Sequence, residues 1–449
     1  MQSDNINPIV KRILVQCKMH LCSPALIGSG ESEYTDRDVF LDSHHHPLIP
    51  GTSLAGILRS ALEDSDAQLL FGKSTNDIDD LGRTSPLWVF DAPVNDAAGN
   101  KADIIIIDNV ALDEYKVAKK GGKFDFQALD RGSTFDLRLM LVIRANDLKC
   151  VSSQPAAECY KLEKVLDKLL NQLNFLYIGG KTSRGFGKLK CSSVSKAILN
   201  TDSFDDLQKW LDFNWSIFDW SACEIPVVRS KPAHIDTMCA KLNLDGTLLI
   251  RDDYSVEGDE DTAHITSAGI PVIYGTSWAG AIRNGLSRLL KANGFDCESY
   301  LDEVFGCDKW DDISAKRKTT PSKIRVDASY FGNNPKTSDK RHAVTRVKID
   351  RWTGGAAESA LFTTKPQFGG SVALTIQYPC GDKAIHELLV LALEAINLGI
   401  ITIGGETSVG RGKFVVVDIN GEKDIETLFA ADKENLVKCM PRKEEFCNV

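Results

Sequence analysis

Two short motifs combine a glycine, a threonine and a serine where a strand-like segment gives way to a helical pattern. The first turn of a helix offers unpaired backbone N–H groups and the positive end of the helix dipole, and the hydroxyls add donors, so such a start can hold a phosphate. An arginine eight residues after each glycine can add a charge-assisted contact. One such motif is more often only a helix cap, but two copies that keep the hydroxyls and the arginine favour phosphate binding. The residues are Thr52, Ser53 and Arg59 in the first motif and Thr276, Ser277 and Arg283 in the second.

Two glycine-rich loops follow later, GGKTSRGFGK at residues 179–188 and GGETSVGRGK at residues 404–413. They are not nucleotide-binding P-loops, because the required earlier glycine is Phe175 and Lys181 is replaced by Glu406. Both keep Thr-Ser-x-Gly-x-Gly-Lys, whose small residues allow a bound chain to approach the backbone closely. A plain tight turn is the alternative. The loop residues assigned to binding are Lys181, Ser183, Arg184, Ser408 and Arg411.

The two kinds of motif recur in the same order at nearly the same spacing. Gly51 and Gly179 are 128 residues apart, and Gly275 and Gly404 are 129 residues apart. A repeat of this length indicates a tandem duplication. We therefore predict a first domain at residues 1–215, a linker at 216–234 and a second domain at 235–449.

Hydrophobic periodicity gives both halves the same order of elements. An alternating strand comes first, a helix follows the Gly-Thr-Ser motif, and a strand, a second helix, the glycine-rich loop and a final strand complete the half. This order predicts an α+β fold of two ferredoxin-like β-α-β-β-α-β units, each with a long insertion in its middle. The predicted strands are 13–21, 133–144 and 187–194 in the first half and 240–250, 371–378 and 412–418 in the second, with second helices at 156–175 and 383–398.

Composition restricts the function classes. The chain has 449 residues and a formal charge of −9, so it is not expected to hold nucleic acid by bulk charge alone. Its sequence has neither an apolar run of the roughly 20 residues that span a bilayer nor a signal-peptide core. Twelve cysteines without a CxxC pair favour reduced thiols. We expect a cytoplasmic protein that does not contact a membrane.

The motifs together resemble the RAMP (repeat-associated mysterious protein) superfamily over nearly the whole chain, twice. The resemblance rests on Pro-Gly-Thr-Ser-x-x-Gly-x-x-Arg, then Leu70-Phe71-Gly72, an Asp-Asn-Val strand, and Gly-Gly-x-x-Ser-x-Gly-x-Gly. It is closest to the backbone subunits of type III CRISPR effector complexes, fused in tandem as in type III-D-like systems. The partners that it implies are a guide crRNA, a complementary target RNA, other RAMP subunits and the large subunit of the complex.

The resemblance also implies that each domain is a modified RNA-recognition fold with a β-hairpin "thumb" in its insertion. Residues 109–129 and 346–362 would form the two thumbs, and both are basic in an acidic chain. A solvated hairpin face is the alternative. The basic residues assigned to RNA, like the loop and helix-start residues above, are Lys116, Lys119, Arg346, Lys348 and Arg351.

Family members that cut target RNA carry an aspartate in the loop before the Gly-Thr-Ser helix, six residues before another acid. Asp36 and Asp42 fit this spacing, whereas Asp261 is followed by Ser267 at the second position. The resemblance implies that Asp36 and Asp261 assist attack of a ribose 2′-OH on its phosphate, directly or through a divalent ion, with Mg²⁺ favoured and its ligands unassigned. The alternative function is a guide-binding scaffold without cleavage. A guide-processing ribonuclease is disfavoured, because such enzymes do not need two thumbs.

Overall fold

The computed structural model describes residues 7–30, 34–73, 84–113, 115, 117–148, 157–218, 220, 224–225, 234–252, 261–311, 316–431 and 433–440. The chain forms two compact units. Unit 1 comprises Met1–Ile105, Ala128–Gly180 and Gly187–Pro232, and unit 2 comprises Ile106–Gln127, Lys181–Phe186 and Ala233–Val449. Unit 2 therefore includes two segments that belong to the first repeat by sequence.

Unit 1 is built on one antiparallel sheet. Strand β1 alternates buried and less buried residues, which places one set of side chains on each face. Helices on one face cover Val15, Cys17 and Met19, and the helical residues Leu54 and Leu58 join the same core. The strand order is β3 (Leu87–Val89), β7 (Thr134–Arg144), β1 (Ile9–Leu21), β8 (Leu189–Asn200) and β9 (Glu224–Ile225), and the helices are α1 (Gly51–Ser60), α2 (Asp64–Phe71) and α3 (Ala157–Leu170).

The second face of the unit 1 sheet is also covered. An aromatic segment after β8 runs through α4 (Phe204–Leu211) and η4 (Trp215–Ile217). Its rings pack on a small buried cluster that includes Leu14 and Met140. We call Trp210, Trp215, Phe218 and Trp220 the aromatic cover.

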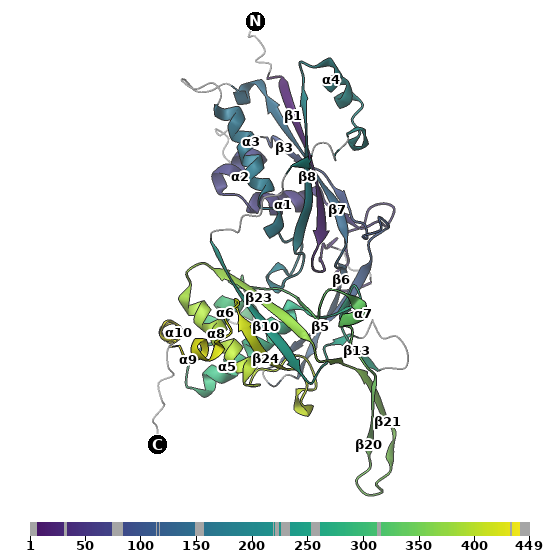
Figure 1. Cartoon of the computed structure of the whole chain (residues 1–449), viewed down its shortest axis with the longest axis vertical. Coiled ribbons are helices and arrows are strands. Elements are labelled where there is room, and N and C mark those ends of the chain that lie inside the picture. Colours follow the sequence, from purple (N-terminus) through teal and green to yellow (C-terminus); the bar gives the residue numbers. More distant parts are fainter. Residues whose placement is uncertain are drawn as a thin grey trace. The chain divides into compact units, whose positions relative to one another are not determined.

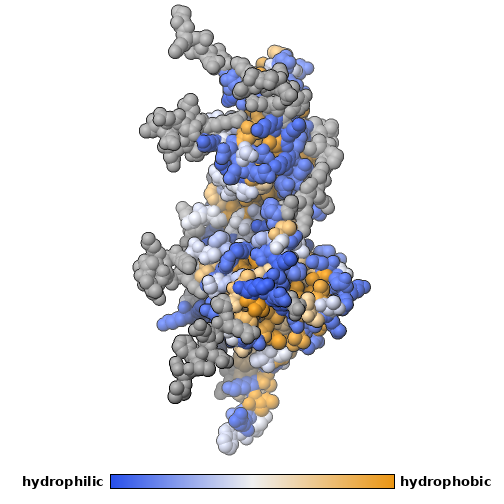
Figure 2. Space-filling model, turned by 90° about the vertical axis from the view of Figure 1, so that its left-hand side faces the viewer, coloured by the Kyte–Doolittle hydropathy of each residue, from blue (hydrophilic) through white to orange (hydrophobic). Residues whose placement is uncertain are grey.

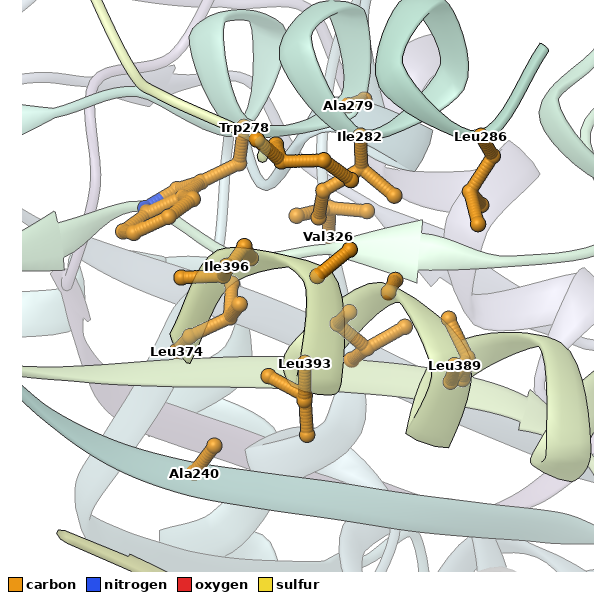
Figure 3. Close-up of a cluster of buried hydrophobic side chains, with 14 of the residues drawn as sticks. Ala240, Trp278, Ala279, Ile282, Leu286, Val326, Leu374, Leu389, Leu393 and Ile396 are labelled. Carbon is orange, nitrogen blue, oxygen red and sulfur yellow. The ribbon is translucent and has the colours of Figure 1, made fainter. Parts of the chain in front are cut away.

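Unit 2 repeats this topology. Its sheet has the order β18 (Arg325–Val326), β23 (Ser371–Pro379), β10 (Ile235–Asp245) and β24 (Lys413–Ile419). Helices α5 (Gly275–Ala292) and α8 (Lys383–Asn397) cover one face, and burial of each large apolar side chain there contributes about 1.5–3 kcal/mol. Figure 3 shows Trp278, Ile282 and Leu286 of α5 and Leu389, Leu393 and Ile396 of α8 gathered over the strand residues Ala240, Val326 and Leu374.

The four main strands of the two sheets are equivalent, and β9 is an additional edge strand in unit 1. When the four main strands of each half are numbered along the chain from its first long strand, their order across the sheet is 2-3-1-4 in both halves. Gly51 and Gly275 both begin a helix after an extended residue. Both glycine-rich loops form a 3-10 turn between two left-handed residues, η3 (Thr182–Arg184) and η5 (Thr407–Val409). The predicted tandem duplication is confirmed.

One predicted strand is misplaced. The alternation over 240–250 suggested a continuous strand, but β10 ends at Asp245. Gly246 follows with φ +86°, a left-handed turn that redirects the chain. The next two residues then pair with another segment, as β11 (Thr247–Leu248) and β22 (Gln367–Phe368).

The insertions form hairpins. The first pairs β5 with β6, and the second pairs β20 with β21 and projects from the body of unit 2 (Figure 1). Among the described residues, no helix is both long and apolar enough to cross a membrane. The hairpin strands are β5 (Ile104–Leu112), β6 (Ala118–Leu129), β20 (Val344–Ile349) and β21 (Ala356–Lys365). The remaining elements are β2 (Leu48–Ile49), β4 (Ala92–Pro93), η1 (Ala145–Leu148), η2 (Leu173–Phe175), β12 (Arg251–Asp252), β13 (Thr262–His264), β14 (Thr266–Ser267), β15 (Ile270–Ile273), α6 (Glu298–Phe305), β16 (Cys307–Asp311), β17 (Lys316–Thr320), β19 (Ser329–Tyr330), α7 (Pro335–Ser338), α9 (Ile425–Ala430) and α10 (Glu434–Lys438).

Candidate functional site at the base of the second hairpin

Asp261 lies at the base of the second hairpin. It directly precedes β13, which runs parallel to β21. Its backbone N–H donates to the Thr363 carbonyl at 2.8 Å, and its Oδ2 accepts from the Thr363 N–H at 2.8 Å. The Thr345 hydroxyl on β20 lies 3.1 Å from that of Thr363. The carboxylate is therefore held in an exposed, hydroxyl-lined position beside the hairpin.

A cluster of three arginines around one glutamate stands at the same hairpin base. Glu406 accepts from Arg346 Nη2 at 2.5 Å, and nitrogens of Arg251 and Arg411 lie 3.6 Å and 3.4 Å from its carboxylate oxygens. Burial opposes ionisation of Glu406, but the hydrogen bond from Arg346 and the neighbouring positive charges outweigh it and lower its pKa. Three guanidinium groups against one carboxylate leave a formal surplus of two positive charges. This surplus can bind phosphate.

The three arginines differ in exposure. Arg411 is only 6% exposed, and its Nη2 lies 3.3 Å from the Thr364 hydroxyl on β21. It therefore contacts the hairpin from the protein interior. Burial, as the largest cause, lowers the Arg411 pKa. Arg346 and Arg251 keep 40% and 60% of their side chains exposed. These two are the accessible cations of the cluster, and RNA contact by Arg411 stays a prediction.

Arg251 was missed by sequence reasoning. The Phe40 N–H donates to the Ile27 carbonyl, and the Ile265 N–H donates to the Ile250 carbonyl, which aligns the two repeats. By this register Arg251 corresponds to Gly28 in the first repeat, so comparison of the repeats gave no signal. Only the fold brings it to Glu406.

The same register places Asp36 and Asp261 at equivalent positions. Asp36 lies four residues before Phe40, and Asp261 lies four residues before Ile265. Both aspartates are exposed. The nearby Asp38 is instead buried and accepts from the Thr35 N–H and hydroxyl at 3.0 Å and 2.8 Å, so it shapes the loop. The catalytic role of Asp36 and Asp261 stays a prediction.

The left-handed residue that opens each glycine-rich loop contacts a hairpin in both repeats. Glu406 (φ +54°) pairs with Arg346, as described above. Lys181 (φ +57°) places its ammonium 4.3 Å and 4.2 Å from the ring centres of Phe124 and Phe126 on β6. We call this position the latch. One latch uses an ion pair and the other uses cation–π contacts.

The predicted phosphate-binding arginines of the helices are engaged within the protein. Arg59 donates to the Gly72 carbonyl at 3.4 Å. Arg283 pairs with Asp302 at 2.5 Å and with Glu298 at 3.4 Å, and Arg184 donates to a backbone carbonyl within unit 2. Thr52 and Ser408 are exposed, whereas Ser53, Ser183, Thr276 and Ser277 are half-buried. Contact of all these residues with RNA stays a prediction.

The second hairpin exposes apolar side chains among cations. Trp352 at its tip is 94% exposed, and Ile349 and Leu361 are exposed on its strands. Lys348 and Arg351 are exposed beside them. On the face shown in Figure 2, hydrophobic and hydrophilic residues alternate along the hairpin at the bottom. In the first hairpin Lys119 is exposed, and Lys116 lies outside the described residues.

The predicted divalent ion has no assigned ligands and stays a prediction. Within the described part of the chain, no group of three or more His, Cys, Asp or Glu side chains comes together as a metal site. Asp261 offers one carboxylate that already accepts a backbone hydrogen bond. Asp261 itself can supply a base, and the nearby arginines supply cations.

Comparison with known proteins gives one family match. A model of the RAMP superfamily matches residues 18–190 and again residues 244–415. Each match contains one Gly-Thr-Ser helix start and one glycine-rich loop. A search of curated proteins gave no match.

Proposed function

Because the chain belongs to the RAMP superfamily and carries two tandem copies of its domain, we propose that it is a guide-RNA-binding backbone subunit of a type III CRISPR effector complex. RAMP proteins are CRISPR-associated RNA-binding subunits, and the proposal adds the complex type and the target. Each copy would be a ferredoxin-like domain, which its strand order supports, with its hairpin as the thumb. The complex would act in the cytoplasm.

The observation that carries the proposal is the second hairpin with its base. Arg251 and Arg346 present the surplus positive charge that an RNA backbone needs. Trp352 offers an exposed ring, and stacking of a base on an aromatic side chain is typically worth about 1–3 kcal/mol. A hairpin with a cationic base and an aromatic tip suits single-stranded or unpaired nucleotides.

We further propose that Asp261 cleaves target RNA as a general base. The carboxylate takes the proton of a ribose 2′-OH, and the 2′-oxygen bonds to the adjacent phosphorus. The bond from phosphorus to the 5′-oxygen breaks, and that oxygen takes a proton from a water molecule. The resulting hydroxide takes the proton held by Asp261, which leaves a 2′,3′-cyclic phosphate, a 5′-OH and the regenerated carboxylate. Arg251 and Arg346 would stabilise the additional negative charge on the phosphate. Asp36 would do the same in the first repeat.

A scaffold without cleavage is the second candidate, and one observation favours it. Asp261 bonds Thr363 through both its N–H and its carboxylate, so it already has a structural role in fastening β13 to β21. The two candidates agree on RNA binding and differ on chemistry.

A cleavage and binding assay tests both parts. The chain, assembled with its guide RNA and partner subunits, is incubated with end-labelled complementary RNA. Asp261→Asn keeps an oxygen that can accept from the Thr363 N–H, and it should slow one cut by about 10²–10⁴-fold. Asp36→Asn should slow a second cut by a similar factor. Cuts that persist in the double variant would establish the scaffold.

RNA binding is measured separately. Arg251→Ala should weaken binding to all guide sequences about equally and lower the salt slope by roughly one unit. Arg288→Ala, at an exposed arginine on α5, is the matched control. Equal binding by both variants would contradict the assignment of the hairpin base to RNA.

A further inference from the structure

Helix α4 of unit 1 exposes a stripe of large apolar side chains. Phe204 and Leu211 are 77% and 74% exposed, and Leu207 between them is exposed as well. Because their spacings are three, four and seven residues, the three side chains lie along one face of the helix. Figure 1 shows α4 and α3 on opposite sides of the sheet, so the stripe is not on the helix-covered face. We call Phe204, Leu207 and Leu211 the α4 stripe.

One flank of the α4 stripe is fixed to the protein. Trp210 packs on the buried cluster of Leu14 and Met140, and the Arg12 guanidinium lies 3.9 Å from the centre of its ring. The Ser203 hydroxyl accepts from the Asp206 N–H and caps the helix start. Packing and capping therefore hold α4 in place, although a helix of this length is not stable alone.

The other flank of the α4 stripe is acidic. Asp205 and Asp212 are exposed and lie seven residues apart, so they share the flank that faces away from Trp210. Asp202, just before the helix, is exposed too. The one lysine of α4, Lys209, lies 4.0 Å from the Asp206 carboxylate. The stripe is therefore bordered by uncompensated negative charge.

The corresponding helix of unit 2 does not expose such a stripe. Helix α9 follows the fourth main strand, β24, as α4 follows β8. Its apolar residues Ile425, Leu428 and Phe429 pack against the unit 2 core. The helix at this place in the chain can therefore bury its apolar residues within its own domain. Exposed large apolar side chains that lie together mark an interaction surface.

We propose that the α4 stripe docks an amphipathic helix of another protein, whose apolar stripe is flanked by lysine or arginine. The two helices would lie side by side, with the leucines and Phe204 between them. The partner's cations would face Asp205 and Asp212, which favours this partner through charge complementarity. The proposal rests on the fold of unit 1 and needs neither RNA binding nor cleavage.

The acidic flank disfavours two other occupants. In a two-fold pair of antiparallel α4 helices, like flanks face each other, so Asp205 of one copy would meet Asp212 of the other. Like charges placed together across an interface oppose association. Helices that lie on membranes carry lysine and arginine beside their apolar face, because lipid surfaces are negative. An acidic border therefore suits neither a second copy nor a membrane.

The test uses the RNA-free full chain and two labelled synthetic helices, each about two heptads long. Both peptides have a leucine stripe, which is flanked by lysine in one and by glutamate in the other. Fluorescence anisotropy should show that wild type binds the lysine peptide roughly tenfold more tightly. Leu211→Ser should weaken that binding by roughly tenfold or more, because an apolar contact is lost. Leu398→Ser, the same change at an exposed leucine of unit 2, is the matched control and should bind like wild type.

Charge variants and two further measurements identify the occupant. Asp205→Asn combined with Asp212→Asn should remove most of the preference for lysine and lower the salt dependence of binding. Unchanged binding by Leu211→Ser, or equal binding of the two peptides by wild type, would overturn the proposal. Sedimentation equilibrium that shows wild-type self-association lost in Leu211→Ser would make a second copy the occupant and overturn the choice of partner. Binding to phosphatidylserine vesicles that Leu211→Ser removes would do the same for a membrane. No arm contains RNA, so failure here leaves the proposed function to its own assay.

Discussion

The two repeats share a sheet topology but differ in what covers the second face of the sheet. In unit 1 the aromatic cover packs over Leu14 and Met140. Strand β1 has a bulge where it pairs with β8, and β10 has a bulge where it pairs with β24. When these two bulges are aligned, Leu14 of unit 1 corresponds to Thr237 of unit 2. On that face of unit 2, Lys241 and Asn243 are exposed and Thr237 is half-buried. A duplicated fold thus keeps its helix-covered core while the other face changes freely between buried and solvated.

The two glycine-rich loops also have the same backbone geometry in different surroundings. Both loops keep the left-handed latch, the 3-10 turn and the left-handed glycine. Gly185 is buried against backbone in unit 2, whereas Gly410 is exposed. The same backbone geometry therefore packs against other backbone in one repeat and lies at an open surface in the other.

The largest expected effect separates these two glycines. Gly185→Ala should lose about 2–5 kcal/mol of unfolding free energy, because the methyl group meets the Asp327 and Ala328 backbone and also sits at positive φ. Gly410→Ala should lose only about 1–2 kcal/mol, since it has the left-handed φ but open space. Urea denaturation measures both. Equal losses would mean that the close packing of Gly185 on Asp327 and Ala328 adds no steric constraint.

An exchange of residues tests the covered sheet face. Leu14→Thr should cost about 2–4 kcal/mol, because it removes buried methyl groups and places a hydroxyl under the aromatic cover. Thr237→Leu at the aligned position should change stability by less than about 1 kcal/mol. Denaturation followed by tryptophan fluorescence reports unit 1 through the aromatic cover. A tolerated Leu14→Thr would show that the cover does not seal that face.

The ion-pair latch predicts a pH dependence. The pKa of Glu406 in the folded protein is lowered from its usual 4.5, so its contribution to stability is present above that value and is lost as pH falls through the folded pKa. Glu406→Gln should therefore melt at a lower temperature than wild type at pH 7, and the difference should shrink as pH is lowered below 4.5. Thermal melts between pH 7 and pH 3 measure it. A difference that stays constant with pH would exclude the carboxylate charge as the cause.

Sequence reasoning predicted the parts of the fold that repeat. The paired Gly-Thr-Ser and glycine-rich motifs predicted the duplication, and periodicity predicted most long strands and helices. It did not predict that Arg184 would donate a hydrogen bond to the Phe305 carbonyl or that Arg411 would be buried. The sequence around a loop arginine does not show whether its side chain faces solvent or packs in the interior. It also missed Arg251, which reaches Glu406 only through pairing between distant strands.

The smallest expected effect concerns the cation–π latch. Lys181→Met keeps the apolar stem over Phe124 and Phe126 but removes the ammonium, and such contacts are worth about 0.5–1 kcal/mol at exposed sites. Amide hydrogen exchange along β6 should accelerate by roughly two- to fivefold, whereas Lys181→Arg should leave it near wild type, because arginine also binds aromatic faces. Exchange along β21 should not change, since Glu406 holds that hairpin independently. Equal exchange in Lys181→Met and wild type would show that the first hairpin is held by Phe126 packing on Phe186 rather than by the latch. That result would restrict latching by charge to the second repeat, where the accessible arginines of the proposed RNA site also lie.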